Sequence, residues 1–182
     1  LKLGATAKVG DAKVTVDGAV KGWRVGHSVI VTASKKHSDV STEERVIKGI
    51  DGRVLTLDRP LRAEHFGTGE FRSEVANLSR NVIIESADPE GVRGHTMFHR
   101  YSKGGISYAR FAHLGKRGVL GRYAIHFHLA GTTMRGSAVV GAAIVDSHNR
   151  WITVHGTQYL MVRDCVGYQS VGHGYFLEDG TE

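Results

Sequence analysis

The sequence predicts an all-β protein in which a small β unit precedes a right-handed parallel β-helix. Glycine is frequent, with 24 of 182 residues, and proline is rare, with 2, which suits many short strands joined by tight turns. Short apolar segments recur along the chain, and none shows the 3.6-residue period of an amphipathic helix. Similar segments also return at intervals of 27, 23 and 22 residues, as the coils of a solenoid do.

The first third of the chain reads as four short strands separated by glycine-containing turns. The clearest element is a hairpin that turns at Asp51-Gly52, a pair that tolerates the positive φ angles of a type I′ turn. The polar segment 59–75 is irregular and is interpreted as a connection, which places a boundary near Ser79 and predicts a β unit over 1–78. The expected strands are 12–16, 28–32, 45–50 and 53–57.

Strands of the β-helix are expected over the remaining residues, 79–182. A parallel β-helix is preferred to a β-sandwich because sandwich strands need no repeat register. The apolar segments that predict these strands are 82–84, 106–111, 124–129, 138–145, 151–154, 159–162 and 175–177.

Three alignments define the expected register of the coils. Residues 125–130 align with 152–157, which sets His155 one coil after His128 at a step of 27 residues. The next coil sets Glu178 in the place of His155, at a step of 23. A further alignment puts residues 143–147 on 165–169, at a step of 22.

The charge balance favours an acidic partner. Lys and Arg exceed Asp and Glu by 24 to 18, giving +6 and an isoelectric point near 9.6. Anionic polysaccharide and nucleic acid both fit this charge, but no zinc finger, phosphate-binding loop or nucleophile elbow supports nucleic-acid or nucleotide chemistry. No apolar run is long enough to predict a membrane span.

Histidines suggest a metal site. His126 and His128 are two residues apart in one strand, so both side chains leave the same face, and the coil register adds His155 and Glu178. Imidazole and carboxylate together suit zinc, iron, manganese or nickel, and an open coordination position would make the site catalytic. The alternative is a structural ladder of stacked side chains. His95 and His99 fall in an irregular segment and are expected to be solvated.

Catalytic roles fall on residues near these histidines. Glu178 is the candidate general acid, and Asp179 supports it only if the chain bends at Asp179-Gly180, because adjacent strand residues face opposite sides. His173, between two glycines, is the candidate general base. Metal-free hydrolysis, metal-dependent hydrolysis and a lyase reaction all remain open at this stage.

Substrate-binding candidates lie in the same region. Arg122 and Arg150 are candidates to bind sugar carboxylates, because a guanidinium holds a carboxylate through two parallel hydrogen bonds. Tyr175 is a candidate to stack on a sugar ring. Each of these side chains also has a non-functional interpretation. The arginines would then lie at a solvated edge of the β-helix, and the aromatic ring would serve in packing.

The sequence resembles a known family in several ordered motifs. Its first third is similar to the later part of a G8 domain, although His27 replaces the usual acidic residue. Its remainder resembles the parallel β-helix of the family that includes the cell migration-inducing hyaluronan-binding protein, transmembrane protein 2 and the fibrocystin-like proteins. The motifs are GWRVGHSVIV at 22–31, LTLDRPL at 55–61, GRYAIHFH at 121–128, VHGT at 154–157 and GHGYFLEDG at 172–180.

This resemblance implies an extracellular or cell-surface setting and hyaluronan or a related glycan as substrate, without establishing turnover. Together with the basic charge and the histidines, it leads us to expect a protein that binds and cleaves an acidic polysaccharide. Family members are longer, so it also implies an excerpt of a longer protein or a minimal bacterial relative. Fibrocystin-like members share the fold without a clear enzymatic role, which leaves two alternatives to an enzyme. These are a non-catalytic glycan-binding or adhesive module and a structural solenoid.

Overall fold

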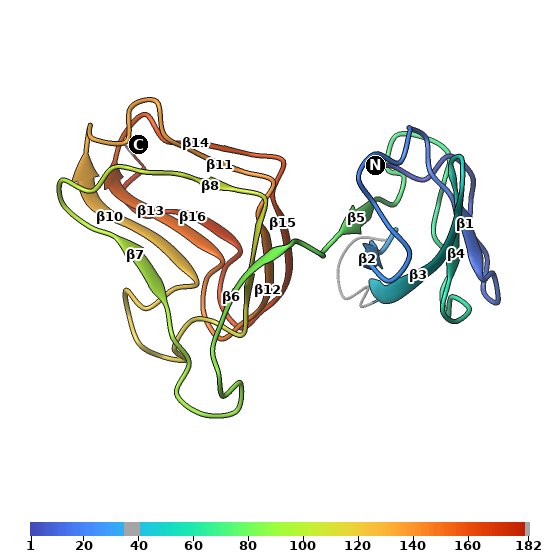
Figure 1. Ribbon diagram of the computed structural model, residues 1–182, viewed down its shortest axis with the longest axis horizontal. Coiled ribbons are helices and arrows are strands. Elements are labelled where there is room, and N and C mark those ends of the chain that lie inside the picture. Colours follow the sequence, from blue (N-terminus) through green and yellow to red (C-terminus); the bar gives the residue numbers. More distant parts are fainter. Residues whose placement is uncertain (35–40, 181–182) are drawn as a thin grey trace. The chain divides into compact units, whose positions relative to one another are not determined.

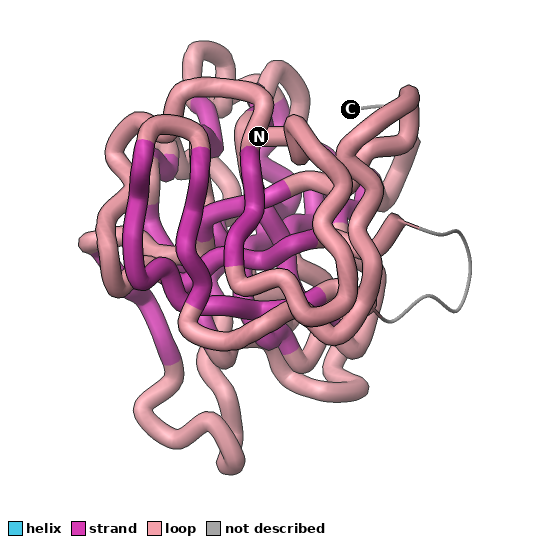
Figure 2. The backbone as a smooth tube through the Cα atoms, turned by 90° about the vertical axis from the view of Figure 1, so that its right-hand side faces the viewer, coloured by secondary structure: helices cyan, strands magenta, loops and turns pink. Residues whose placement is uncertain are grey.

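The computed structural model describes residues 1–34 and 41–180, in two compact units, Leu1–Ser79 and Arg80–Glu182. Within these ranges every element of regular secondary structure is a β-strand (Figure 2), so the all-β prediction is confirmed. Within those ranges no helix has the length and apolar character needed to cross a membrane.

The first unit is a five-stranded antiparallel sheet with the order β1-β4-β3-β2-β5 (Figure 1). Buried and less buried side chains alternate along its strands. Ile47 on β3 and Leu55 and Leu57 on β4 are among the buried ones. The strands are β1 (Lys13–Thr15), β2 (Ser28–Val31), β3 (Glu43–Asp51), β4 (Val54–Leu57) and β5 (Val75–Asn77).

The β3–β4 hairpin is confirmed, but its turn differs from the expected type. Asp51 pairs with Val54, so the two central residues are Gly52 and Arg53. Only Gly52 has a positive φ, at 55°. A glycine with positive φ at the first central position is the pattern of a type II′ turn, which also matches the twist of the flanking strands.

The segment 59–75 was expected to be a connection, and this was wrong. Leu61 and His65 are fully buried in the first unit, and Val75 begins the edge strand β5. His65 was overlooked because a single histidine among polar residues carries no periodic signal. The segment is therefore part of the core of this unit.

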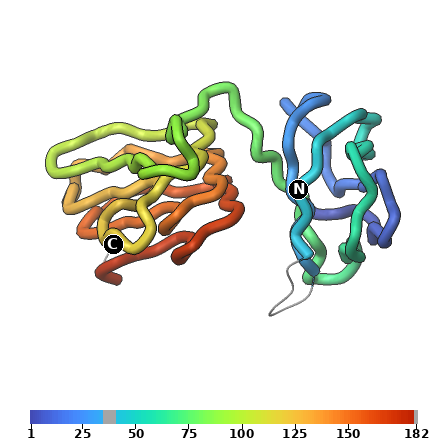
Figure 3. The backbone as a smooth tube through the Cα atoms, turned by 90° about the horizontal axis from the view of Figure 1, so that it is seen from below, coloured from blue at the N-terminus to red at the C-terminus, as the bar shows by residue number. Residues whose placement is uncertain are grey.

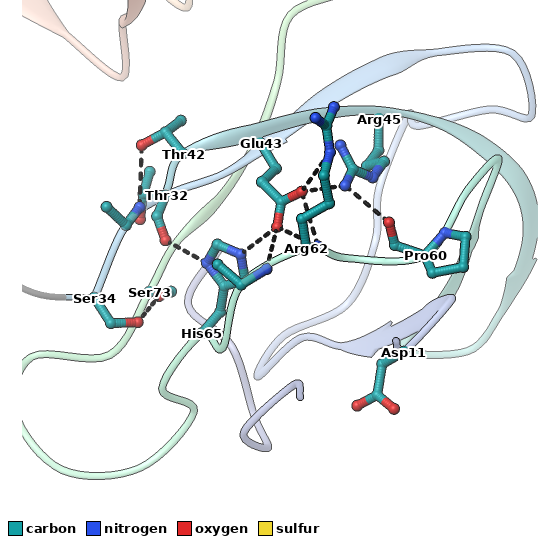
Figure 4. A network of polar contacts seen from close by, with 12 residues as sticks. Asp11, Thr32, Ser34, Thr42, Glu43, Arg45, Pro60, Arg62, His65 and Ser73 are labelled. Carbon is teal, nitrogen blue, oxygen red and sulfur yellow. Dashed lines mark hydrogen bonds and ion pairs between the residues drawn. The ribbon is translucent and has the colours of Figure 1, made fainter. Parts of the chain in front are cut away.

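A buried polar network explains why the segment folds inward (Figure 4). His65 Nδ1 lies 2.9 Å from the Thr32 carbonyl oxygen, and its Nε2 lies 3.1 Å from the Glu43 carboxylate. The same carboxylate accepts the backbone N–H groups of Arg62 and Ala63 and pairs with the buried guanidinium of Arg45. Burial alone would raise the pKa of Glu43, but these hydrogen bonds outweigh it and the pKa is lowered.

The second unit is a parallel β-helix, as predicted. Its coils stack in three parallel sheets, and the stacked coils are seen from below in Figure 3. The first sheet holds β7 (Thr96–Phe98), β10 (Ile125–Gly131), β13 (Ile152–Thr157) and β16 (Tyr175–Leu177). The second holds β8 (Ile106–Ser107), β11 (Ala138–Val140) and β14 (Met161–Arg163), and the third holds β6 (Val82–Glu85), β9 (Ala109–Ala112), β12 (Ala143–Ser147) and β15 (Val166–Ser170).

Left-handed corner residues divide two segments that were each expected to be one strand. Tyr108 (φ 51°) separates β8 from β9, and Gly141 (φ 63°) separates β11 from β12. A Cβ at Gly141 would come within 2.5 Å of the Tyr108 ring, so the stacked corner requires glycine there. Neither corner was predicted, because residues 138–145 are continuously apolar and residues 106–111 contain no glycine, proline or asparagine to mark a turn.

The register of the third sheet also corrects one alignment. Ala143 pairs with Val166, a step of 23 residues rather than the expected 22. Inside the solenoid, apolar side chains stack coil on coil, and the rings of Phe98 and Phe127 lie parallel with centroids 4.5 Å apart. The inward side chains of β10 therefore fix its neighbours, His126 and His128, on the outer face.

Candidate functional site

A polar ladder runs over the outer face of the β7-β10-β13-β16 sheet. His128 is the register partner of His155. Val154 pairs with Leu177, and the Glu178 amide donates to the Val154 carbonyl, which places Glu178 one coil after His155. The expected steps of 27 and 23 residues are confirmed. The polar ladder comprises His99, His128, His155 and Glu178.

His126 lies beside the polar ladder but is almost fully buried. The ring of Tyr123 packs against it, with centroids 4.7 Å apart. Its Nδ1 lies 2.9 Å from the Gly121 carbonyl oxygen, which can only accept, so Nδ1 carries the hydrogen. Its Nε2 is buried and finds no hydrogen-bond partner among the described residues.

The charge state of His126 follows from its burial. Burial lowers the pKa of His126 to about 4, against a smaller opposite effect of the hydrogen bond to Gly121. The ring is therefore neutral near neutral pH, with a free electron pair on Nε2. A buried, unsatisfied acceptor is rare in folded proteins and points to a missing partner at this position.

His155 is oriented by Asp179. The Nε2 of His155 lies 3.4 Å from Asp179 Oδ1, and the other oxygen of Asp179 accepts the Gly156 backbone N–H. A hydrogen on Nε2, directed at this carboxylate, would leave the electron pair of the neutral ring on Nδ1. The chain does turn after Asp179, at Gly180 with φ 72°.

Three imidazoles converge in this way. His126, His128 and His155 each offer one nitrogen, and these atoms lie within 4.8 Å of one another. Two nitrogens bound to one zinc at tetrahedral angles would be about 3.3 Å apart. The Nδ1 atoms of His128 and His155 are hydrogen-bonded at 3.0 Å, so one of them carries a hydrogen. A change of tautomer in that ring, with a small rotation, would direct both nitrogens at one cation.

Glu178 lies next to these histidines. Its Oε2 is 3.9 Å from His155 Nδ1 and 3.3 Å from a guanidinium nitrogen of Arg150. Arg150 donates a hydrogen bond to this oxygen. The structure thus places Glu178 beside the histidine cluster, and its role as the general acid expected from the sequence stays a prediction.

Arg150 was expected to bind a substrate carboxylate, and the structure gives it different contacts. Its guanidinium carbon lies 3.6 Å from the centroid of the Phe176 ring and 4.6 Å from that of Tyr123. Only 15% of its side chain is exposed. Arg150 is therefore held between two rings with its charge directed at Glu178, which makes it a support for the site.

The other expected site residues are not brought into the histidine cluster by these contacts. Arg122 lies in the loop before β10, half-buried. His173 is exposed, and its ring centroid lies 5.0 Å from that of Phe176. Tyr175 is the register partner of the core residue Ile152, so its side chain takes the inward direction, and burial raises its pKa to about 12.

His99 was overlooked by sequence reasoning. It follows β7 directly, one position after the Phe98–Phe127 pair, and its ring lies 5.3 Å from that of His128 in a stacked arrangement. Although His99 is exposed, as expected for a solvated residue, it belongs to the polar ladder. The Phe-His dipeptide at 98–99, repeated at 127–128, was the signal that could have identified it.

A second polar cluster lies at a different corner of the solenoid. Asp146 follows the core strand residue Val145 and accepts hydrogen bonds from Arg93 at 3.0 Å and His113 at 2.8 Å. Burial would raise the pKa of Asp146, but these two partners lower it. Arg93 also donates to the Asp146 carbonyl oxygen, so this cluster joins neighbouring coils.

Comparison with known families decides where this chain belongs. A family model described as CEMIP beta-helix matches residues 91–182, half of the chain and all of the polar ladder. The chain belongs to the CEMIP beta-helix family. The β-helix resemblance is thereby confirmed, and the G8 resemblance is confirmed by a curated G8 domain-containing relative that matches the whole chain.

Several curated relatives extend this likeness to the first unit. A G8 domain-containing protein of Dictyostelium discoideum is 33% identical over 190 residues, and Communication mutant protein F of the same organism is 32% identical over 185. Fibrocystin-L of Mus musculus is 31% identical over 234 residues. Each match covers 100% of this chain but only 13%, 16% and 6% of the respective relative.

Phage tailspikes are among the solved structures that align with this chain. The alignment with the tailspike of Pseudomonas phage phi297 covers 96% of this member of the CEMIP beta-helix family and 33% of the tailspike chain, at 11% sequence identity and a TM-score of 0.37. The alignment with the tailspike of Acinetobacter baumannii phage AP22, solved in complex with capsular saccharide, covers 90% of this chain and 33% of the tailspike chain, at 9% sequence identity and a TM-score of 0.37.

Proposed function

We propose that this chain binds and cleaves an acidic polysaccharide of the hyaluronan type at a divalent metal centre held by His126, His128 and His155. The observation that carries the proposal is the buried Nε2 of His126, which has an available electron pair and no hydrogen-bond partner among the described residues. A cation placed among the three imidazoles would satisfy it. Zinc, iron, manganese and nickel all accept this ligand chemistry.

The hydrogen bonds around the ligands support metal binding. Metal-binding histidines commonly donate their second ring N–H to a carbonyl or carboxylate oxygen, which fixes the ring and the tautomer. His126 donates to Gly121 in this way, and His155 faces Asp179. Purely structural stacking of histidines would not require either arrangement.

The residues around the cluster can support hydrolysis. In that reaction a water oxygen bonds to the anomeric carbon, the glycosidic C–O bond breaks, water loses a proton and the leaving oxygen gains one. Glu178, beside His155, is proposed to give a proton to the leaving oxygen. His173 is the candidate for receiving the proton of water, and a bound divalent ion would polarise the substrate or the water.

The nature of the substrate rests on charge and on the family. The net charge of +6 favours an anionic ligand, and the G8 and β-helix resemblance directs the choice to hyaluronan in an extracellular or cell-surface setting. A non-catalytic glycan-binding module would keep the same cationic surface. The two functions differ in their need for the histidine cluster.

The test measures hyaluronan chain length after incubation with protein purified without a histidine tag, before and after chelation. We expect the wild-type protein to shorten hyaluronan. Chelation should abolish this activity, and zinc or another single metal should restore it. The His155→Ala variant should lack it. An unsaturated, ultraviolet-absorbing product would identify elimination instead of hydrolysis. Binding of hyaluronan without any shortening under all metal conditions would contradict the proposed cleavage and favour the binding module.

A further inference from the structure

One segment of the β-helix sequence carries basic residues and no acidic ones. Residues 91–145 contain eight Lys or Arg residues and no Asp or Glu. This segment therefore carries +8, whereas the whole chain carries +6. A long run with one sign of charge creates a local field for an anionic ligand. The eight are Arg93, Arg100, Lys103, Arg110, Lys116, Arg117, Arg122 and Arg135.

One group of these cations precedes the ladder strand β10. The loop that carries them is held by Asn149, whose Nδ2 donates to the Lys116 and Val119 carbonyl oxygens at 2.9 and 3.1 Å. The same loop supplies the Gly121 carbonyl that binds His126. The backbone of the loop that carries these cations is therefore held at the upstream end of the histidine cluster. This upstream group consists of Lys116, Arg117 and Arg122.

A second group lies downstream, in the loops that follow β7 and β10. The Thr133 hydroxyl donates to the Ser102 carbonyl oxygen at 2.8 Å, which ties the two loops together. Arg100 follows the ladder residue His99 and acts electrostatically on His128. All three cations in these loops are exposed. The downstream group consists of Arg100, Lys103 and Arg135.

Exposed aromatic rings accompany the downstream group. The guanidinium carbon of Arg135 lies 3.5 Å from the ring centroid of Tyr159, which is 55% exposed. Tyr101, between Arg100 and Lys103, is 87% exposed. Rings beside cations suit a ligand that combines apolar sugar faces with negative groups, because they offer stacking area and charge together.

We propose that an extended anionic sugar chain lies across the outer face of this sheet, parallel to its strands, from the upstream group over the histidines to the downstream group. The inference rests on the proposed function for the substrate class, but its residues are separate from the metal ligands. The seven residues of β10 span about 20 Å, so the bound segment is an oligosaccharide and not a single sugar. A chain lying along the solenoid axis would contact only one group.

The test compares two pairs of substitutions with a matched control. Lys116→Gln with Arg117→Gln removes two of the three positive charges of the upstream group, and Arg100→Gln with Lys103→Gln removes two of the three of the downstream group. Lys48→Gln with Arg53→Gln removes the same charge from exposed residues of the first unit. Binding of labelled hyaluronan oligosaccharides of graded length is measured at low and high salt, together with metal content.

Each ladder-flanking pair is expected to weaken binding of long oligosaccharides about tenfold at low salt, with a smaller effect at high salt. The control is expected to change binding less than twofold. Weakening by only one pair, or equal weakening by the control, would overturn the proposed path. If both pairs weaken binding but no metal is ever found, the path stands and the metal-dependent cleavage fails.

Discussion

The Nδ1 atoms of His128 and His155 lie 3.0 Å apart, although 27 residues separate the two histidines in sequence. Stacked parallel strands produce this contact, because register partners in adjacent coils are about 4.8 Å apart and direct their side chains to the same face. His126 lies two residues before His128 on the same strand, so its side chain points to the same outer face. The β-helix therefore builds a compact imidazole cluster from two strands.

The support of Glu178 by Arg150 leads to the first prediction. Arg150→Gln should remove the charge paired with Glu178 and the contacts with the rings of Tyr123 and Phe176. Metal affinity should fall about tenfold, as it does when groups that orient ligands are lost. The cation–π contacts should cost about 2 kcal/mol of unfolding free energy in total.

Arg150→Lys and Arg163→Gln serve as comparisons for this prediction. Lysine keeps the charge but not the planar stacking, so it should recover part of the metal affinity. Arg163 is exposed and its guanidinium faces Asp164, so its replacement should change neither quantity. Metal titration and urea denaturation measure both effects. Wild-type affinity in Arg150→Gln would show that Arg150 does not support the site.

The buried network of the first unit predicts a specific acid sensitivity. The folded pKa of Glu43 is lowered from the ordinary value of 4.5, so its stabilising contribution is complete above that value and is lost as the pH falls through the lowered pKa. Glu43→Gln should cost about 3 kcal/mol at pH 7, because Arg45 and His65 lose a charged partner. The difference from wild type should shrink as the pH decreases from 5 to 3.

Urea denaturation across this pH range tests the acid sensitivity. A Trp151→Phe background leaves Trp23 to report on the first unit, since these are the two tryptophans of the chain. Glu64→Gln, an exposed substitution nearby, is the control and should leave the pH profile unchanged. A constant difference between Glu43→Gln and wild type at all pH values would refute the lowered pKa.

The stack inside the solenoid gives a prediction about stability. Phe127 is fully buried and its ring lies 4.5 Å from that of Phe98, so Phe127→Ala should cost about 3–5 kcal/mol. Leu129, two residues later, would share this face in a regular strand, but its positive φ of 51° breaks the alternation and leaves it 39% exposed. Leu129→Ala should therefore cost under about 1 kcal/mol. Urea denaturation followed by Trp151 fluorescence in a Trp23→Phe background compares the two. Similar costs for both would contradict the different burial of these two side chains.

The sequence allowed the coils and the three histidines to be predicted because both depend on simple periods. A period of two residues places His126 and His128 on one face, and the coil step adds His155. The same alternation, applied to β16, would have separated Tyr175 from Glu178, since the two are three residues apart. The choice of Tyr175 as a substrate residue ignored that rule.

Other features depend on contacts that no local pattern encodes. The position of Arg150 is set by rings from Tyr123 and Phe176, which come from different coils. His99 follows a strand of three residues, too short for a periodic signal. His65 is buried through hydrogen bonds to Thr32 and Glu43, which only the folded sheet brings together.

The most direct test is the metal content of untagged protein, measured by mass spectrometry for wild type, His126→Ala and His148→Ala after dialysis against metal-free buffer. His148 lies outside the cluster and is the matched histidine control. We predict one divalent transition metal per chain in wild type and His148→Ala, and less than a tenth of that in His126→Ala, with all three folded by circular dichroism. Metal-free wild-type protein that also fails to bind added zinc, iron, manganese or nickel, or full occupancy in His126→Ala, would contradict the account.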